Sequence, residues 1–238
     1  DTSSLGAVSY GGAPAAPELV RRIRDAFPQC TASNGYGLTE TSALVIANVG
    51  IDYDRKPDSI GLPVAVCEVK IIAADGGELE AGHVGELCIK GPNVVAGYWR
   101  KPEATAQSFQ EGWLYTGDIA RIDDEGFVYI LDRAKDMLIR GGENVYCVEV
   151  EDVLYSHPAV MDAAVVGIPH RVLGEEVGAI VQLAPGTSLE PDALRAYAAT
   201  RLAGFKVPVQ IVVQLEPLPR NANGKIMKRD LKQQLGWI

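Results

Sequence analysis

The sequence predicts a mixed α/β and α+β protein, in which the end of a large N-terminal domain is followed by a small C-terminal α+β domain. Three patterns support this prediction. Residues 1–55 alternate apolar runs with a helical pattern, residues 56–131 alternate apolar and polar side chains, and residues 132–238 mix strand and helix patterns. We therefore expect a first domain over 1–131 and a second, mobile domain over 132–238, with their boundary near Asp132.

The first piece is typical of a β-α-β unit. The apolar run Leu5–Tyr10 precedes two glycines and predicts a buried strand. A helix then starts near Pro17, with four apolar residues on one face: Leu19, Val20, Ile23 and Phe27. A short strand over Thr31–Asn34 leads into a glycine loop at 35–37. Because a parallel sheet needs further strands and helices on both faces, we expect the missing part of this domain upstream.

The middle of the chain is typical of an antiparallel β subdomain. Side chains from Val66 to Ile71 alternate with the period of a half-buried strand. A turn at Asp75–Gly77 separates it from a second strand, Gly85–Lys90. The polar turn Asp123–Gly126 then precedes a strand over Phe127–Leu131.

The last part of the chain predicts an independent α+β domain of common size. Its expected strands are Ala163–Ile168, Gly178–Leu183 and Gln210–Val213, and its expected helices are roughly Val148–Ser156, Asp192–Leu202 and Met227–Leu235.

Composition excludes several classes of protein. The chain has 238 residues, of which 47% are hydrophobic, so it is not wholly disordered. Its 4 cysteines form no C-x-x-C pair, which argues against a disulfide framework or a cysteine-based zinc site and suits a reducing compartment. No stretch is long and apolar enough to span a bilayer, and no leader opens the chain. We expect a cytoplasmic protein without a transmembrane segment.

The charge pattern argues against nucleic acid as a partner. The net charge is −9, although the residues from Arg201 onward carry more basic than acidic side chains. These basic residues are scattered, and the chain as a whole repels phosphate backbones. A small phosphorylated ligand, which needs only one or two well-placed cations, fits better.

A glycine-rich segment, residues 34–41, has the residue types that a nucleotide site uses. Gly35 and Gly37 let backbone approach a ligand, and Tyr36 offers a flat face for a base. A hydroxyl at Thr39 and a carboxylate at Glu40 suit a phosphate and Mg²⁺. The segment fails as a dinucleotide fingerprint, because Glu40 stands at the last glycine position. A plain glycine-rich turn between a strand and a loop is the alternative.

Three further motifs are ambiguous by themselves. Asp118, after a glycine, can accept hydrogen bonds from two ribose hydroxyls, or can be an ordinary acidic turn residue. The charged run 132–136, followed by Gly141-Gly142, can be a hinge whose Arg133 reaches a ligand, or a solvated linker. Lys225 lies in a turn-rich loop that lacks the first glycine of a phosphate-binding P-loop, so it can be simply solvated.

Taken together and in order, the motifs resemble those of the adenylate-forming superfamily, most closely acyl-CoA synthetases of the fatty-acid–CoA ligase type. The resemblance covers essentially the whole chain. Its five motifs are Gly11-Gly12-Ala13-Pro14, YGLTE at 36–40, YTGD at 115–118, DRAKD at 132–136 and NGK at 223–225.

The resemblance implies a set of nucleotide contacts. It assigns adenine binding to Gly12, Ala13, Pro14, Asn34 and Tyr36, and it assigns ribose or phosphate binding to Thr39, Asp118 and Arg133. Gly35 is expected to border the acyl group.

The same resemblance implies catalytic and mobile parts. Lys225 matches the lysine of the adenylation step, where Thr39 and Glu40 also act, and Glu40 is expected to hold Mg²⁺. Lys135 matches a hinge, and Gly141-Gly142 match the strand that lines the channel for CoA. The implied substrates are a carboxylic acid, such as a fatty acid, together with ATP and CoA.

One expected part is absent from the sequence. Related enzymes carry a Ser/Thr/Gly-rich phosphate loop upstream of the GGAP segment, so we expect this chain to be a C-terminal part that is inactive alone. Three alternatives remain: an aryl-CoA ligase, an adenylation domain that loads a carrier protein, and a non-catalytic module that binds a nucleotide or acyl-CoA.

Overall fold

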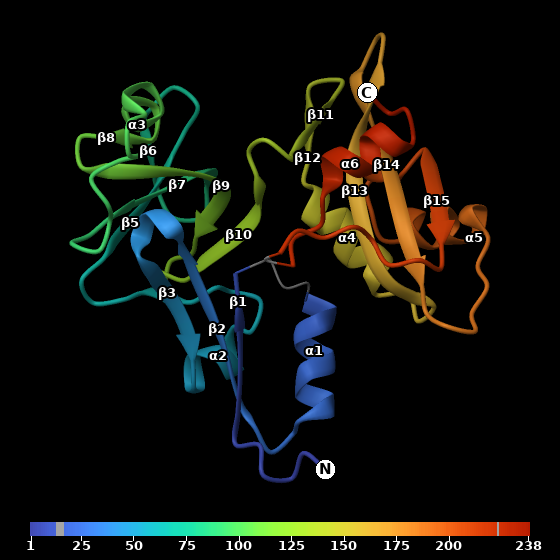
Figure 1. Cartoon of the computed structure of the whole chain (residues 1–238), viewed down its shortest axis with the longest axis horizontal. Helices are drawn as coiled ribbons and strands as arrows, with labels where there is room; N and C mark the ends of the chain where they lie inside the picture. Colours follow the sequence, from blue (N-terminus) through green and yellow to red (C-terminus); the bar gives the residue numbers. More distant parts are fainter. Residues whose placement is uncertain (13–16, 223) are drawn as a thin grey trace. The chain divides into compact units, whose positions relative to one another are not determined.

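The computed structural model describes residues 1–12, 17–222 and 224–238, with side chains omitted at 17 and 18. It divides the chain into two compact units, Asp1–Lys135 and Asp136–Ile238. The first runs from blue to green in Figure 1 and the second from yellow-green to red. The mixed α/β and α+β class is confirmed.

The first sheet of the first unit has the order β1-β2-β3-β4. Strands β1 (Ala7–Gly11) and β2 (Thr31–Leu38) are parallel and are connected through α1 (Pro17–Ala26). The antiparallel strands β3 (Ala43–Val49) and β4 (Leu62–Pro63) complete the sheet. The expectation of a buried first strand is wrong: β1 is an edge strand among the described residues, with side chains alternately exposed and half-buried.

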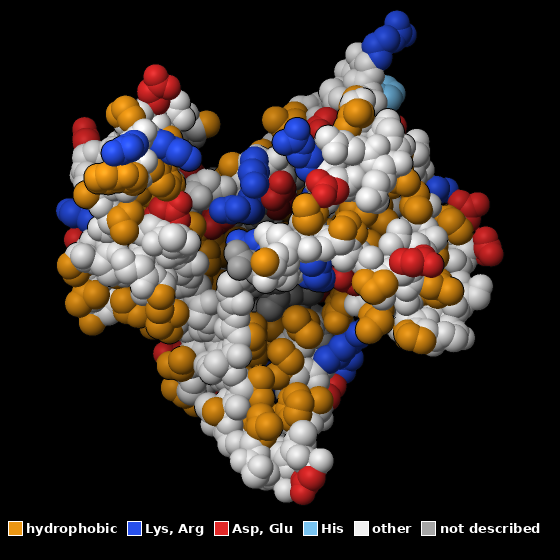
Figure 2. Space-filling model, in the orientation of Figure 1, with side chains coloured by type: hydrophobic (Ala, Val, Ile, Leu, Met, Phe, Trp, Pro, Cys, Tyr) orange, Lys and Arg blue, Asp and Glu red, His pale blue; other side chains and the backbone are white. Residues whose placement is uncertain are grey.

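Hydrophobic side chains are open to solvent near this edge. Figure 2 shows them over α1 and β1, and Leu5 and Leu19 are 38% and 37% exposed. The predicted helix is present, but its apolar face is only partly covered: Val20 is buried at 3% exposure, whereas Ile23 and Phe27 are half-buried.

Strand β2 continues through the glycines that we expected to form a loop. It runs to Leu38, and Tyr36 pairs with Ile46 of β3. The glycines are needed because backbones meet here without room for side chains. A Cβ at Gly11 would lie 2.2 Å from the Gly35 carbonyl oxygen, and one at Gly37 would lie 1.6 Å from that of Ala43.

The second sheet of this unit is antiparallel, as predicted, with the order β10-β9-β7-β5-β6 and with β8 on β9. Its strands are β5 (Glu68–Ile72), β6 (Glu78–Leu79), β7 (Val84–Lys90), β8 (Phe109–Gln110), β9 (Trp113–Ile122) and β10 (Val128–Arg133). The helices of the unit besides α1 are η1 (Thr39–Thr41), α2 (Ile51–Arg55) and α3 (Pro102–Ser108). One apolar core joins the two sheets through residues that include Val45, Ile46, Ile71, Leu87, Ile89 and Val128.

The segment after α2 is bonded to the β9–β10 hairpin. Val128 donates its N–H to the carbonyl of Gly61 at 2.9 Å and accepts the amide of Ile60 at 2.9 Å. The buried Ser59 hydroxyl also donates to the Val128 carbonyl, at 2.7 Å. These bonds attach the hairpin to the segment that continues into β4 of the first sheet.

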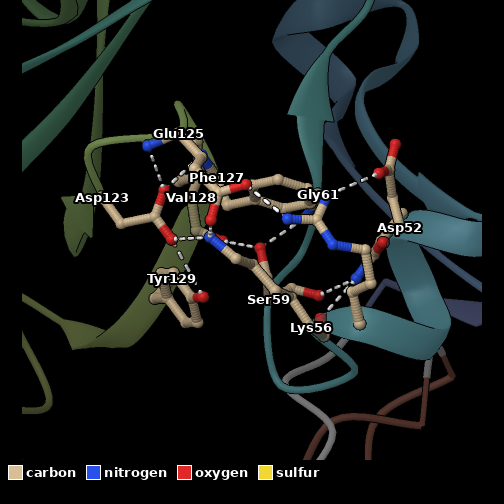
Figure 3. Close-up of polar contacts among 11 residues, drawn as sticks. Asp52, Lys56, Ser59, Gly61, Asp123, Glu125, Phe127, Val128 and Tyr129 are labelled. Carbon is tan, nitrogen blue, oxygen red and sulfur yellow. Dashed lines mark hydrogen bonds and ion pairs between the residues drawn. The ribbon is translucent and has the colours of Figure 1, made fainter.

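An ion cluster reinforces the same seam. Figure 3 shows Lys56 extending to the hairpin turn, where its ammonium lies 2.5 Å from Asp123 Oδ2 and 2.9 Å from Glu125 Oε1. Burial opposes ionisation of Asp123, but hydrogen bonds from Lys56 and from backbone amides outweigh it and lower the Asp123 pKa. Hydrogen bonds from Lys56 and Arg55 lower the Glu125 pKa. Both carboxylates therefore favour the folded state when ionised.

The second unit is a five-stranded sheet with helices on both faces. The sheet order is β12-β11-β14-β13, and β15 pairs in parallel with β14. The strands are β11 (Leu138–Arg140), β12 (Glu143–Val145), β13 (Val160–His170), β14 (Gly174–Leu183) and β15 (Gln210–Gln214). The helices are α4 (Cys147–Tyr155), α5 (Pro191–Ala199), η2 (Gly204–Lys206) and α6 (Lys228–Gln234).

Alternate residues of β13 face the two cores of this unit. Ala163 and Val165 pack with residues of α4 and α5, whereas Ala164 and Val166 pack with residues of α6 and with Trp237. The period of the strand thus divides the apolar residues between two helical layers. Among the helices of the described ranges, none is both long and apolar enough to cross a membrane.

We predict that Lys56→Met lowers the free energy of unfolding at neutral pH and flattens its pH dependence. The lowered pKa values of Asp123 and Glu125 stabilise the fold above the ordinary carboxyl range of about 4, and that stabilisation is lost as pH falls through the lowered values. The deficit of the variant should therefore shrink in acid. Urea titrations over this pH range would measure it, with the exposed Lys101→Met as the control. A deficit that does not change with pH would contradict the prediction.

Candidate functional site

The carboxylate of Asp118 accepts hydrogen bonds from two side chains that the sequence analysis assigned to nucleotide binding, Tyr36 and Arg133. Arg133 lies opposite Asp118 in the register of β10 with β9, and its Nε donates to Asp118 Oδ1 at 2.8 Å. From the first sheet, the Tyr36 hydroxyl donates to Asp118 Oδ2. Asp118 is only 5% exposed, whereas the Arg133 side chain is 36% exposed. The structure therefore joins three of the predicted nucleotide residues at one buried acid.

Burial and charge keep the Tyr36 hydroxyl protonated. Desolvation by burial raises its pKa most, and the negative charge and hydrogen bond of Asp118 raise it further. A phenol in this state remains a hydrogen-bond donor throughout the physiological pH range. Tyr36 can thus fix one oxygen of Asp118 while Arg133 fixes the other.

The backbone before Asp118 has its own supports. Gly117 adopts a φ of +70°, which favours glycine. Its amide donates to Glu86 Oε1 at 2.8 Å, and its carbonyl accepts the amide of Ala134 at 2.8 Å. The Thr116 hydroxyl donates to the Leu87 carbonyl at 2.8 Å and accepts the Asp118 amide at 3.1 Å. The sequence does not single out Glu86, because it lies within β7 and outside the five motifs.

Glu40 has a partner that the sequence did not indicate. It belongs to η1 directly after β2, and its Oε1 accepts the Tyr98 hydroxyl at 2.7 Å. This hydrogen bond is the main cause that raises the pKa of Tyr98. The Glu40 carbonyl also accepts the Val95 amide at 2.8 Å. Two contacts therefore tie Glu40 to the loop before α3.

The turn at η1 leaves Thr39 open to solvent. Thr39 is exposed, while Thr41 is fully buried and accepts the Leu38 amide at 3.0 Å. The Thr41 hydroxyl also contacts the carbonyls of Leu38 and Ala43, at 3.0 and 2.8 Å. The buried threonine thus fixes the turn that presents Thr39.

The donor set at Glu40 fits Mg²⁺. A half-buried carboxylate supplies the hard oxygen that this ion prefers. Within the described ranges no three His, Cys, Asp or Glu residues are grouped as a complete metal cage. Magnesium is usually held by one or two carboxylates together with substrate phosphates, so a single glutamate is sufficient.

Three of the predicted adenine and acyl residues, Gly12, Asn34 and Gly35, lie at the first sheet. Gly12 is exposed with a φ of +80° after β1, and Asn34 pairs with Tyr10 and Asn48 in the neighbouring strands. Gly35 pairs with Gly11 on one side and with Ala47 on the other. Ala13 and Pro14 lie outside the described residues.

The remaining predicted residues lie at the division of the units or in the second unit. Lys135 is exposed and is the last residue of the first unit. Gly141 and Gly142 form the turn between β11 and β12, with φ values of +60° and +92°. The Lys225 side chain is exposed on the loop before α6. The Lys225 amide donates to Asn221 Oδ1 at 3.0 Å, within the same loop of the second unit.

Two family models match the chain. Residues 1–99 match the model described as "AMP-binding enzyme", and residues 149–225 match "AMP-binding enzyme C-terminal domain". The chain is 39% identical over 99% of its length to a feruloyl-CoA synthase of Amycolatopsis, covering 48% of that protein. It is 42% identical over 98% of its length to a long-chain-fatty-acid–CoA ligase of Salmonella typhimurium, covering 41% of that protein. The chain spans about half the length of the curated relatives it matches.

Solved structures agree with the sequence comparisons. The amide bond synthetase McbA from Marinactinospora thermotolerans superposes with a TM-score of 0.90 at 37% identity, over 99% of this chain and 47% of that one. The o-succinylbenzoate CoA synthetase from Bacillus subtilis, in complex with its acyl-adenylate intermediate, superposes with a TM-score of 0.86 at 38% identity, over 97% of this chain and 46% of that one.

We predict that Tyr36→Phe destabilises the chain by about 1–3 kcal/mol, because the buried carboxylate of Asp118 loses one of its donors. Urea denaturation at neutral pH would measure the loss. Tyr115→Phe, on the same strand as Asp118, is the matched control and should change stability by less than about 0.5 kcal/mol. Equal stability of Tyr36→Phe and the parent chain would show that the hydroxyl does not support Asp118.

Proposed function

Because the chain belongs to the adenylate-forming superfamily of AMP-binding enzymes, we propose that it forms the C-terminal part of an acyl-CoA synthetase. The proposed reaction joins a carboxylic acid to CoA at the expense of ATP and releases AMP and pyrophosphate. The observation that carries the proposal is the contact of Tyr36 and Arg133 with the buried Asp118 carboxylate. The chain spans about half of its relatives, which supports inactivity of this part alone.

Asp118 is the proposed acceptor for the ribose hydroxyls of ATP. An ionised carboxylate offers about four acceptor sites, and Tyr36 and Arg133 use one on each oxygen. As far as the contacts of the described residues go, this leaves one site on each oxygen for a diol. Arg133 is partly exposed and can also contact ribose or phosphate. Tyr36 would stack on the adenine, near Gly12, Ala13, Pro14 and Asn34, and Gly35 would border the acyl group.

Glu40, Thr39 and Lys225 are the proposed catalytic residues of adenylation. Mg²⁺ bound at Glu40 would neutralise phosphate charge, and the Thr39 hydroxyl would donate to a phosphate oxygen. The ammonium of Lys225 would stabilise the negative charge that develops as the carboxylate attacks the α-phosphorus and pyrophosphate leaves. All three residues act by position and charge and form no covalent bond.

The second step requires a different arrangement, because the CoA thiol must reach the acyl-adenylate. We propose that Lys135, at the division of the two units, is the hinge for this change. Rotation there would withdraw Lys225 and present the Gly141-Gly142 turn to the pantetheine arm. The absence of side chains on that turn suits close approach of a narrow ligand.

The acid is proposed to be a fatty acid. The enzyme is proposed to be cytoplasmic. The 42% identity to a long-chain-fatty-acid–CoA ligase supports this substrate class. An aryl acid is the second candidate, because a 2-succinylbenzoate–CoA ligase of Geobacillus kaustophilus is 43% identical over 94% of the chain and 45% of that protein.

The full-length protein should release pyrophosphate from ATP only when a suitable acid is present, and should form the CoA thioester of that acid. A panel of fatty and aromatic acids, assayed for pyrophosphate and for thioester, tests the reaction and separates the two substrate classes. Nucleotide binding without acid-dependent pyrophosphate release would instead favour a non-catalytic module. Pyrophosphate release without a CoA thioester would point to another acceptor.

In that full-length protein, Lys225→Ala should lower acyl-adenylate formation by roughly 10²–10³-fold, the scale of losing one preorganised charge. Thioester formation from a supplied acyl-adenylate should be largely spared, because Lys225 is proposed to leave before that step. The two half-reactions are measured separately, with Lys232→Ala, a change of a half-buried lysine on α6, as the control. Equal losses in both half-reactions would refute the role of Lys225.

A further inference from the structure

The loop that carries Lys225 is closed on itself by hydrogen bonds. Arg220 and Ile226 form an antiparallel bridge, and the Asn221 amide donates to the Lys225 carbonyl at 2.9 Å. In return, the Lys225 amide donates to Asn221 Oδ1 at 3.0 Å. The backbone of Lys225 is therefore fixed through both its amide and its carbonyl, although its side chain is exposed.

The segments on both sides of the loop are anchored in an apolar core. Leu218 precedes the loop and is 3% exposed, and Leu231 and Trp237 follow it at 2% and 8%. They pack with the side chains of one face of the sheet, Ala164, Val166 and Ile180. The loop therefore starts and ends on a rigid base.

Arg220 ties the first side of the loop to β13. Its guanidinium donates to the carbonyl of Gly224 and to Asp162 Oδ2. The other oxygen of Asp162 accepts the amide of Ala163 at 3.0 Å. Gly224 has a φ of +78°, a conformation that glycine adopts readily. Arg220 thus holds the loop at the residue directly before Lys225.

Lys228 ties the second side of the loop to the same strand. It is the first residue of α6, and its ammonium lies 2.7 Å from Glu151 Oε1 of α4. Glu151 Oε1 also accepts the amide of Val165 at 2.8 Å. Both side chains of this pair are mostly covered, at 22% and 21% exposure.

The two ion pairs share one support. Strand β13 is last in the order of its sheet, and the amides of Ala163 and Val165 lie two residues apart on it, so they point to the same side. Each amide is bonded to one of the carboxylates, Asp162 or Glu151. These two amides at the edge of β13 are thereby satisfied, and this part of the strand supports both ends of the Lys225 loop.

We propose that Arg220 and Lys228, acting through Asp162 and Glu151, are positioning residues that fix Lys225 for the adenylation step. This inference rests on the proposed function of Lys225. Partly exposed ion pairs contribute little to global stability, but displacement of a catalytic group by about 1 Å can cost about 10²-fold in rate. The pairs therefore act on the placement of the ammonium more than on folding.

Arg220→Gln in the full-length protein tests the proposal. Acyl-adenylate formation should fall by about ten- to a hundredfold, while thioester formation from a supplied acyl-adenylate stays within about twofold. Arg220→Lys should restore part of the rate, because an ammonium can pair with Asp162 but lacks the second arm that reaches Gly224. Arg229→Gln, an exposed change of the same charge on α6, is the matched control and should leave both half-reactions unchanged.

Hydrogen exchange provides a test that is independent of activity. In the 238-residue chain, Arg220→Gln should accelerate exchange of the Lys225 amide by about tenfold, and Arg229→Gln should not. Unchanged exchange, unchanged adenylation, or equal losses in both half-reactions would overturn the proposal. A different result would separate the two proposals: the parent enzyme adenylates no acid, while Arg220→Gln still accelerates exchange. The contacts by which Arg220 and Lys228 hold the Lys225 loop would then be supported, and the proposed function would be refuted.

Discussion

A single buried carboxylate, that of Asp118, connects the two sheets of the first unit at the candidate site. Tyr36 reaches it from the first sheet and Arg133 reaches it from the neighbouring strand of the second. Leaving the buried Asp118 carboxylate unpaired would cost its full desolvation penalty. Tyr36 and Arg133 must therefore both stay within hydrogen-bond distance of it, which limits how the two sheets can lie against each other. At the other end of the β9–β10 hairpin, the Ser59–Val128 bond and the Lys56 cluster attach it to the segment that leads into the first sheet. The hairpin is thus held at both ends. The fold therefore sets the distance between the Tyr36 ring, the proposed adenine contact, and the Asp118 carboxylate, the proposed acceptor for the ribose hydroxyls.

The glycines of the first sheet are required by the packing of its strands, whether or not a ligand binds there. Gly11, Gly35 and Gly37 lie where three strands approach so closely that a Cβ would overlap backbone or a side chain. The sequence shows only that side chains are absent at these positions, which is equally typical of a turn and of a ligand contact. Whether a glycine faces another strand depends on pairing partners far along the chain. This is why residues 35–37, which the sequence predicts to form a loop, lie in strand β2.

The predictable part of the structure depends on local periodicity. Helices α4, α5 and α6 and strands β13 and β14 lie close to their expected ranges, because each has a regular apolar pattern of its own. Motif order was enough to name Asp118 and Arg133, but their contact requires the register of β10 with β9, which shifts between Ile130 and Asp132. A slip of one residue would turn Arg133 to the other face. Glu86, Tyr98 and Lys56 have partners 31, 58 and 67 residues away. A local sequence pattern cannot predict contacts over such separations.

The contacts of Arg220 and Lys228 that hold the Lys225 loop are needed because of the proposed hinge at Lys135. If the second unit turns as a body between the two half-reactions, Lys225, the proposed catalytic lysine, must return to the same place in every cycle. A loop that moved freely on a moving unit would spread the ammonium over many positions and lose the advantage of preorganised charge. Arg220 and Lys228 transfer the rigidity of β13 to the loop through two carboxylates that are themselves bonded to the strand. Under this proposal, motion would be confined to the division between the units, and the loop would serve only to position Lys225.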